Sequence, residues 1–170
     1  TLLIKNATVI TVAGDALPIT PGAILIEDQH IAAVGHSEAL VKRYSNADRV
    51  IDGGRKVVAP GFISTHNHLG YTVFRGRAEE AGLECVTGQY MPMNTVITRE
   101  ERRAIGSLTC AELLKSGVTT IMEMEEDVEV YAELIDAIGM RAGMGVMTFD
   151  VDPDGMARGE YTYDDQRRIE

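Results

Sequence analysis

The sequence has 170 residues, of which 45% are hydrophobic and only 5% aromatic, a composition typical of a globular protein of one domain or slightly more. A net charge of −10 without any basic stripe argues against a nucleic-acid polymer as partner. No apolar run approaches the roughly 20 residues of a membrane-spanning helix, and no secretory signal is evident. Cys85 and Cys110 lack the spacing of a disulfide framework or a zinc ribbon. We therefore expect a cytoplasmic protein that does not bind membranes.

Residues 1–58 carry strand patterns. The first is "LLIKNATVITV", and the second, "GAILIEDQHIAAVG", predicts a hairpin that turns at residues 27–29. A third pattern is "DRVIDGGRKVVAP", and Ser37 to Tyr44 could form a short helix. So few strands bury too little apolar surface to be stable alone, so we expect them to pair with another part of the protein.

Residues 59–170 instead alternate between strand and helix patterns. The expected elements are a strand over 62–68, a helix between Thr98 and Gly117, a strand over 118–124, a helix between Asp127 and Gly139, a strand over 140–150, and the start of a third helix over 161–170. Thr98 and Glu101 have the spacing of a capping box. This order predicts a parallel sheet with crossover helices. The irregular stretch from Leu69 to Ile97 is long enough to be a lid or a binding element.

The segment "PGFISTHNHLG" carries the strongest chemical signal. Successive strand side chains point to opposite faces, so His66 and His68 share one face and Asn67 takes the other. Two converging neutral imidazoles suit a metal ion, although a hydrogen-bonded pair of strand histidines is the alternative. His30 and His36 lie beside a turn and a loop, and we do not expect them to be ligands.

Four motifs together, "VIDGGRKVVAPG", "APGFISTHNHLG", "YTVFRG" and "LTCAELLKSGVTTIMEM", resemble the amidohydrolase superfamily of metal-dependent hydrolases. The similarity is to the branch of atrazine-type chlorohydrolases and aminohydrolases, methylthioadenosine/adenosylhomocysteine deaminases and guanine-type deaminases. The resemblance implies an α/β fold, a (β/α)8 TIM barrel with an N-terminal β-sandwich segment. About three β/α units fall within this sequence, as residues 59–170 following a sandwich segment over 1–58. Ile63 and Ile121 would then face the barrel interior.

The same resemblance implies that His66 and His68 bind one divalent metal ion, with zinc favoured over iron. Such an ion acidifies water to give a nucleophile near neutral pH. The expected reaction is hydrolytic deamination or dechlorination of a small N-heterocycle such as a purine, pyrimidine or triazine, in a homo-oligomer. The alternatives are a cyclic-amide hydrolase of the dihydroorotase or hydantoinase type and a metal-free, non-catalytic relative. The catalytic acid and base would lie beyond residue 170, so we expect these residues alone to be inactive.

Some single residues also have expected roles. In the deaminase relatives a loop glutamate contacts ribose hydroxyls, and Glu84 of "GLEC" stands at a comparable place, which makes it the predicted substrate-binding residue. Arg75 of "FRG" matches a family arginine whose role we expect to be structural. We interpret the acidic run over 123–127 as helix capping by Asp127, with acids favoured near a positive N-terminus. Cys110 is expected to be a small buried hydrophobe.

Overall fold

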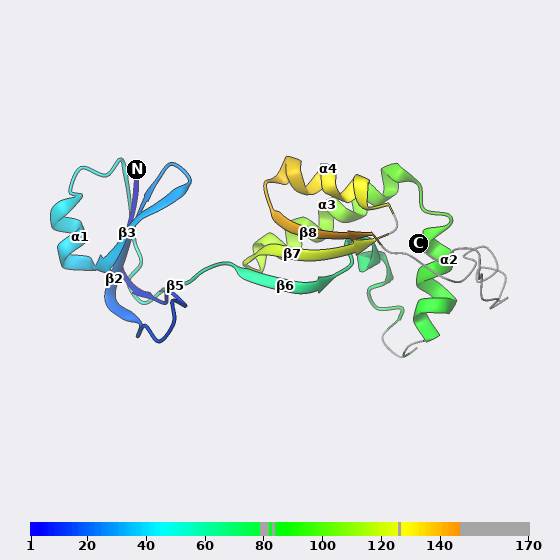
Figure 1. Cartoon of the computed structure of the whole chain (residues 1–170), viewed down its shortest axis with the longest axis horizontal. Coiled ribbons are helices and arrows are strands. Elements are labelled where there is room, and N and C mark those ends of the chain that lie inside the picture. The colour runs from blue at the N-terminus through cyan, green and yellow to red at the C-terminus, as the bar shows by residue number, and fades with distance from the viewer. Residues whose placement is uncertain (79–81, 83, 126, 147–170) are drawn as a thin grey trace, which may run out of the picture. The chain divides into compact units, whose positions relative to one another are not determined.

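The computed structural model describes residues 1–78, 82, 84–125 and 127–146. The chain divides into two compact units, Thr1–Pro60 and Gly61–Glu170, which are described separately below (Figure 1). The last part of the strand expected over 140–150 and the helix expected over 161–170 lie outside the described residues. None of the helices in the described ranges is long and apolar enough to cross a membrane.

Unit 1 is an open, five-stranded sheet with one helix. Its elements are β1 (Leu2–Val9), β2 (Ile19–Glu27), β3 (His30–His36), α1 (Ser37–Arg43), β4 (Arg49–Asp52) and β5 (Val57–Val58). The strand order is β3-β2-β1-β4, with β5 also paired to β1. The β2–β3 hairpin is antiparallel and turns where the sequence predicts it, with Asp28 in the left-handed region at φ 52°.

The core of unit 1 follows from strand alternation. Leu3 of β1 and Leu25 of β2 are register partners, and both are buried with Leu40 of α1. Ile24, one residue from Leu25, belongs instead to a second cluster with Ala7 and Val9 of β1. The described residues of unit 1 form a single open sheet covered in part by α1, and its membership of a larger β-sandwich, which the family resemblance implies, stays a prediction.

Unit 2 contains a three-stranded parallel sheet in the order β6-β7-β8. Its elements are β6 (Phe62–Asn67), the 3-10 helix η1 (Leu69–Phe74), the π-helix η2 (Val86–Tyr90), α2 (Met91–Asn94), α3 (Arg99–Lys115), β7 (Val118–Glu125), α4 (Val128–Ile138) and β8 (Arg141–Val146). The predicted parallel sheet with crossover helices is confirmed (Figure 1). The helix α3 connects β6 to β7, and α4 connects β7 to β8. The stretch over 69–97, expected to be irregular, contains three short helical segments.

Both long helices pack on one face of this sheet. Ile121 of β7 is fully buried among Cys110 of α3 and Tyr131 of α4. Ile63 and Met122, in contrast, are 64% and 44% exposed. The expectation that Ile63 and Ile121 share a face is therefore wrong, because Ile121 registers with Ser64, the residue after Ile63. The sheet is thus covered by helices on the Ile121 face.

The helix ends show which local signals were reliable. Thr98 and Glu101 form the predicted capping box at the start of α3. Gly139 ends α4 in the left-handed region at φ 81°, which glycine adopts without strain. Asp127 precedes α4 but makes no side-chain capping hydrogen bond. The capping role expected for Asp127 is therefore wrong, because its carboxylate pairs with Arg102 of α3 instead.

Candidate functional site

The two histidines of "THNH" lie close together at the carboxyl end of β6. The ring centroids of His66 and His68 are 5.0 Å apart, with the ring planes at 76°. His66 is exposed and His68 is partly buried. The Asn67 side chain takes a different direction, toward β7. The alternation expected from the sequence therefore brings the two imidazoles together at the end of the strand.

One ring nitrogen of His68 forms a hydrogen bond with the protein backbone. Nδ1 lies 2.8 Å from the carbonyl oxygen of Met124 on β7. Because a carbonyl oxygen can only accept, Nδ1 carries the hydrogen in this contact and the lone pair is on Nε2. Burial lowers the pKa of His68, and the neighbouring His66 lowers it further, against the opposing effect of the Met124 hydrogen bond. The neutral, oriented imidazole that results is the form that binds metal ions.

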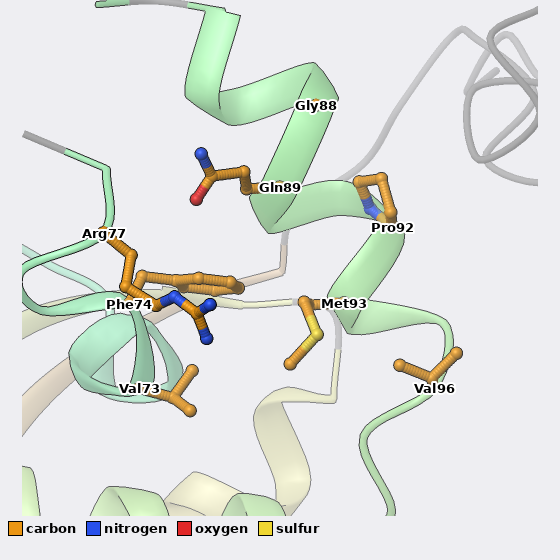
Figure 2. Close-up of a pocket in the computed structure, with 8 residues that line it drawn as sticks. All are labelled: Val73, Phe74, Arg77, Gly88, Gln89, Pro92, Met93 and Val96. Atoms are coloured by element: carbon orange, nitrogen blue, oxygen red, sulfur yellow. The ribbon is translucent and has the colours of Figure 1, made fainter. Parts of the chain in front are cut away.

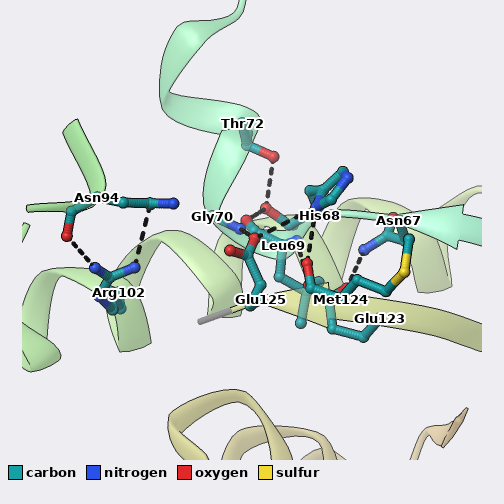
Figure 3. A network of polar contacts seen from close by, with 11 residues as sticks. Asn67, His68, Leu69, Gly70, Thr72, Asn94, Arg102, Glu123, Met124 and Glu125 are labelled. Atoms are coloured by element: carbon teal, nitrogen blue, oxygen red, sulfur yellow. Dashed lines mark hydrogen bonds and ion pairs between the residues drawn. The ribbon is translucent and has the colours of Figure 1, made fainter. Parts of the chain in front are cut away.

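A buried glutamate of β7 contacts the residues on both sides of His68 (Figure 3). Glu123 Oε2 accepts from Asn67 Nδ2 at 2.6 Å, and Glu123 Oε1 accepts from the Leu69 N–H at 2.9 Å. Glu123 is fully buried, and this burial raises its pKa to about 7, whereas the hydrogen bonds from Leu69 and Asn67 lower it. The position of Glu123 follows from register, because it pairs with Asn67 across the parallel strands.

Glu125 extends this contact to the next turn of chain. It is fully buried, and its Oε1 accepts from the Gly70 N–H at 3.2 Å and lies 4.0 Å from His68 Nδ1. A methyl group on Gly70 would stand 2.7 Å from the Tyr131 hydroxyl oxygen, so only glycine fits here. The sequence interpretation missed both glutamates. Their alternation with Ile121 was the available signal, since residues 121, 123 and 125 share one face of a strand.

Hydrogen bonds from α3 hold the same turn from a second side. Thr109 Oγ1 donates to the Leu69 carbonyl oxygen at 2.9 Å and lies 2.6 Å from Thr72 Oγ1. Arg75, directly after η1, forms a two-pronged ion pair with Glu112 of α3. The expected structural role of Arg75 agrees with this contact. The turn after His68 is therefore fixed by side chains from both β7 and α3.

A buried arginine links three elements near the site. The Arg102 guanidinium of α3 donates to the backbone carbonyl and the side-chain oxygen of Asn94, the last residue of α2. Its Nε lies 2.9 Å from Asp127 Oδ2, directly before α4. Only 4% of the Arg102 side chain is exposed, against 53% for Asp127. Arg102 thereby attaches the end of the 69–97 stretch to α3, as Figure 3 shows, and its ion pair with Asp127 connects α3 to the start of α4.

Aromatic rings continue from His68 into the same stretch. Tyr71 stacks on His68 with centroids 4.6 Å apart, and Tyr90 of η2 stacks on Tyr71 at 4.4 Å. Phe74 lies 4.7 Å from Tyr90. Phe74 also faces a hollow of about 690 Å³ (Figure 2), whose lining residues are Val73, Phe74, Arg77, Gly88, Gln89, Pro92, Met93 and Val96.

Glu84 is exposed and lies two residues before η2, and its contact with a substrate stays a prediction.

Comparison with known proteins decides the family. The model of the Amidohydrolase family matches residues 57–169, which include both histidines and both buried glutamates. The chain belongs to the amidohydrolase family. The resemblance inferred from the sequence motifs is therefore confirmed.

Relatives of this amidohydrolase include nucleoside deaminases. It is 35% identical over 144 residues to the 5′-deoxyadenosine deaminase of Methanosarcina mazei, covering 84% of this chain and 32% of that protein. It is 37% identical over 150 residues to the 5-methylthioadenosine/S-adenosylhomocysteine deaminase of Syntrophobacter fumaroxidans, covering 88% and 34%. The chain thus spans about a third of the length of the curated relatives it matches.

A solved structure shares the fold. The atrazine chlorohydrolase TrzN from Arthrobacter aurescens, complexed with zinc, matches with a TM-score of 0.72 at 21% identity, covering 91% of this chain and 37% of that one. The described part of our amidohydrolase is an α/β portion with open sheets. Closure into a barrel stays a prediction.

The donor set near His68 fits part of a metal site. Two imidazoles two residues apart on the strand can supply two ligands, whereas a catalytic zinc site ordinarily uses three protein ligands. Within the described ranges, no group of three or more His, Cys, Asp or Glu side chains is arranged to hold a metal ion. His30 and His36 lie in unit 1, on β3. Among the described histidines, His66 and His68 are therefore the pair that could share an ion.

Proposed function

We propose that the intact protein is a metal-dependent hydrolase that deaminates a small N-heterocycle, and that His66 and His68 provide two ligands to its divalent ion, with zinc favoured over iron. The observation that supports this most directly is the paired geometry of the rings. Their centroids are 5.0 Å apart, and the His68 Nδ1–Met124 contact leaves the Nε2 lone pair available. A bound ion would supply Lewis acidity, which lowers the pKa of water toward neutrality.

The relatives favour an adenine nucleoside as the substrate. Both deaminases above act, by their names, on adenosines altered at the 5′ position. Glu84, in the stretch that also contains the Tyr71–Tyr90 stack, is our proposed contact to the ribose hydroxyls. A carboxylate suits this role because it accepts hydrogen bonds from two adjacent hydroxyl groups. Dechlorination of a triazine is the second candidate, favoured by the fold shared with the atrazine chlorohydrolase.

The decisive experiment measures metal content and product release in the intact protein. We expect ammonia from 5′-deoxyadenosine, 5′-methylthioadenosine or S-adenosylhomocysteine, with a chlorotriazine and a hydantoin as comparison substrates. His66→Ala and His68→Ala should each lose most bound metal and nearly all turnover. His36→Ala, on β3 of unit 1, is the matched control and should keep both. Full metal occupancy in the double variant His66→Ala/His68→Ala would contradict the assignment.

The same assay separates the substrate classes. Glu84→Gln should raise the KM for nucleosides about tenfold, because it weakens a hydrogen bond to a charged group. The KM for a triazine, which has no ribose, should not change. Glu100→Gln, another exposed acid, is the control. Hydrolysis of a hydantoin without ammonia release from any aminated heterocycle would favour the cyclic-amide alternative. No turnover and no bound metal would favour a non-catalytic relative.

A further inference from the structure

The carboxylate of Glu123 spans the residues before and after His68. We propose that Glu123 is a positioning residue that fixes His68 for metal binding, an inference that rests on the proposed function. Its two oxygens bind different parts of one short segment, 2.6 Å from Asn67 Nδ2 and 2.9 Å from the Leu69 backbone nitrogen. The segment is thereby held at two points that bracket the histidine.

The remaining freedom of His68 is removed by the neighbours of Glu123 on β7. The carbonyl of Met124 accepts from His68 Nδ1, and Glu125 accepts from the Gly70 N–H. Three consecutive residues of β7 thus bind four consecutive residues of the site segment, 67–70. A metal ligand whose backbone and second nitrogen are both fixed presents its free nitrogen in one direction.

Packing alone does not account for a carboxylate at position 123. Ile121, two residues before it on the same face of β7, lies among the apolar Cys110, Leu134 and Ile135. Burying a charged group is costly unless hydrogen bonds compensate, and an apolar residue would avoid that cost. Every hydrogen bond described for Glu123 goes to the segment that contains His68. The carboxylate therefore serves the segment and not the core.

Isosteric variants separate positioning from general stability. Glu123→Leu keeps the volume but removes both acceptors, so we expect the Zn²⁺ dissociation constant of the intact protein to rise about 10- to 100-fold. Glu123→Gln should stay within about threefold, because its oxygen can accept from Leu69 and its amide can donate to a rotated Asn67 side chain. Dissociation constants would be measured by competition with a chromophoric chelator, alongside the unfolding midpoint.

Cys110→Ala is the matched control, because Cys110 is fully buried in the apolar cluster that contains Ile121 of β7. It should lower the unfolding midpoint without changing Zn²⁺ affinity. Equal loss of affinity in Cys110→Ala and Glu123→Leu, or wild-type affinity in Glu123→Leu, would overturn the proposal. If Glu123→Leu does not fold, Asn67→Leu takes its place. It removes one of the two contacts and should weaken Zn²⁺ about tenfold, and wild-type affinity there would equally overturn the proposal.

Failure of the proposed function is recognised by a different result. If His68→Ala binds Zn²⁺ as the wild type does, His68 is not a ligand, and both the function and this inference fall. If His68→Ala loses Zn²⁺ but Glu123→Leu does not, the metal site stands and only the positioning role of Glu123 is wrong. The two proposals are thus tested by separate variants in one titration.

Discussion

The two units of the chain bury different kinds of side chain. Unit 1 has two apolar clusters, one around Leu3, Leu25 and Leu40 and one around Ala7, Val9 and Ile24, and the buried polar residue described there is the uncharged Ser37. Unit 2 buries an apolar cluster too, but it adds polar and charged side chains, namely Asn94, Arg102, Thr109, Glu123 and Glu125. Glu123, Glu125 and Thr109 hydrogen-bond to residues between 67 and 72. Arg102 contacts Asn94 at the end of α2 and Asp127 directly before α4. Unit 1 therefore buries mainly apolar side chains, whereas unit 2 also buries charged groups, whose burial costs free energy unless hydrogen bonds compensate.

The largest expected effect tests the apolar side of this comparison. Leu25→Ala should destabilise unit 1 by about 2–5 kcal/mol, since it removes a buried side chain and leaves a cavity. Hydrogen exchange in the intact protein should show lost protection in β1 and β2, with β7 unchanged. Ile31→Ala, at a position 66% exposed, is the control and should have little effect. Equal loss of protection in both units would show that they unfold as one body.

The next effect tests the charged side. Asp127→Ala leaves the buried Arg102 guanidinium without its counter-charge, and we expect a loss of about 2 kcal/mol of unfolding free energy, below the usual cost because Asp127 is half exposed. Glu133→Ala is the control, because Glu133 pairs with Arg99 and Arg103 at the surface. That variant should lose less than about 1 kcal/mol. Denaturant unfolding measures the unfolding free energy of both variants. Equal losses would mean that the burial of Arg102 does not strengthen its ion pair with Asp127 beyond that of a surface pair.

The smallest effect concerns a local signal. Thr98→Ala removes the capping box of α3 and should cost about 1 kcal/mol. Thr98→Ser, which keeps the hydroxyl group, is the control and should retain most of the stability. The measurement is again denaturant unfolding. An unchanged unfolding free energy in Thr98→Ala would show that the packing of α3 alone determines where the helix starts.

These helix starts also show how far the sequence could predict the fold. The Thr98–Glu101 box is contained in four residues, so its prediction needed no tertiary information. Asp127 stands at an equally suitable position, but its partner Arg102 is 25 residues away and outweighs the local preference. Periodicity gave the parallel strands and both long helices, because their apolar faces are regular. The short segments η1, η2 and α2 lack such periods and were missed.

The candidate site was predictable in part for the same reason. His66 and His68 share a short motif, so alternation alone brought their rings together. Glu123 and Glu125 looked like acids placed before a helix, and only register with β6 reveals their contact with Asn67, Leu69 and Gly70. Irregular register between Ser64 and Asn67 cannot be read from the sequence of either strand. Metal binding by the two histidines stays a prediction.

The stack on His68 gives the protein an optical property of its own. The 170 residues contain six tyrosines and no tryptophan, so the ultraviolet emission of this part of the protein comes mainly from phenol rings. The ring centroid of Tyr71 lies 4.6 Å from that of His68, and the ring centroid of Tyr90 lies 4.4 Å from that of Tyr71. A change in the electronic state of the imidazole therefore acts on a fluorophore in direct contact with it. We therefore expect the emission of Tyr71 to respond to a change at His68 without any added label.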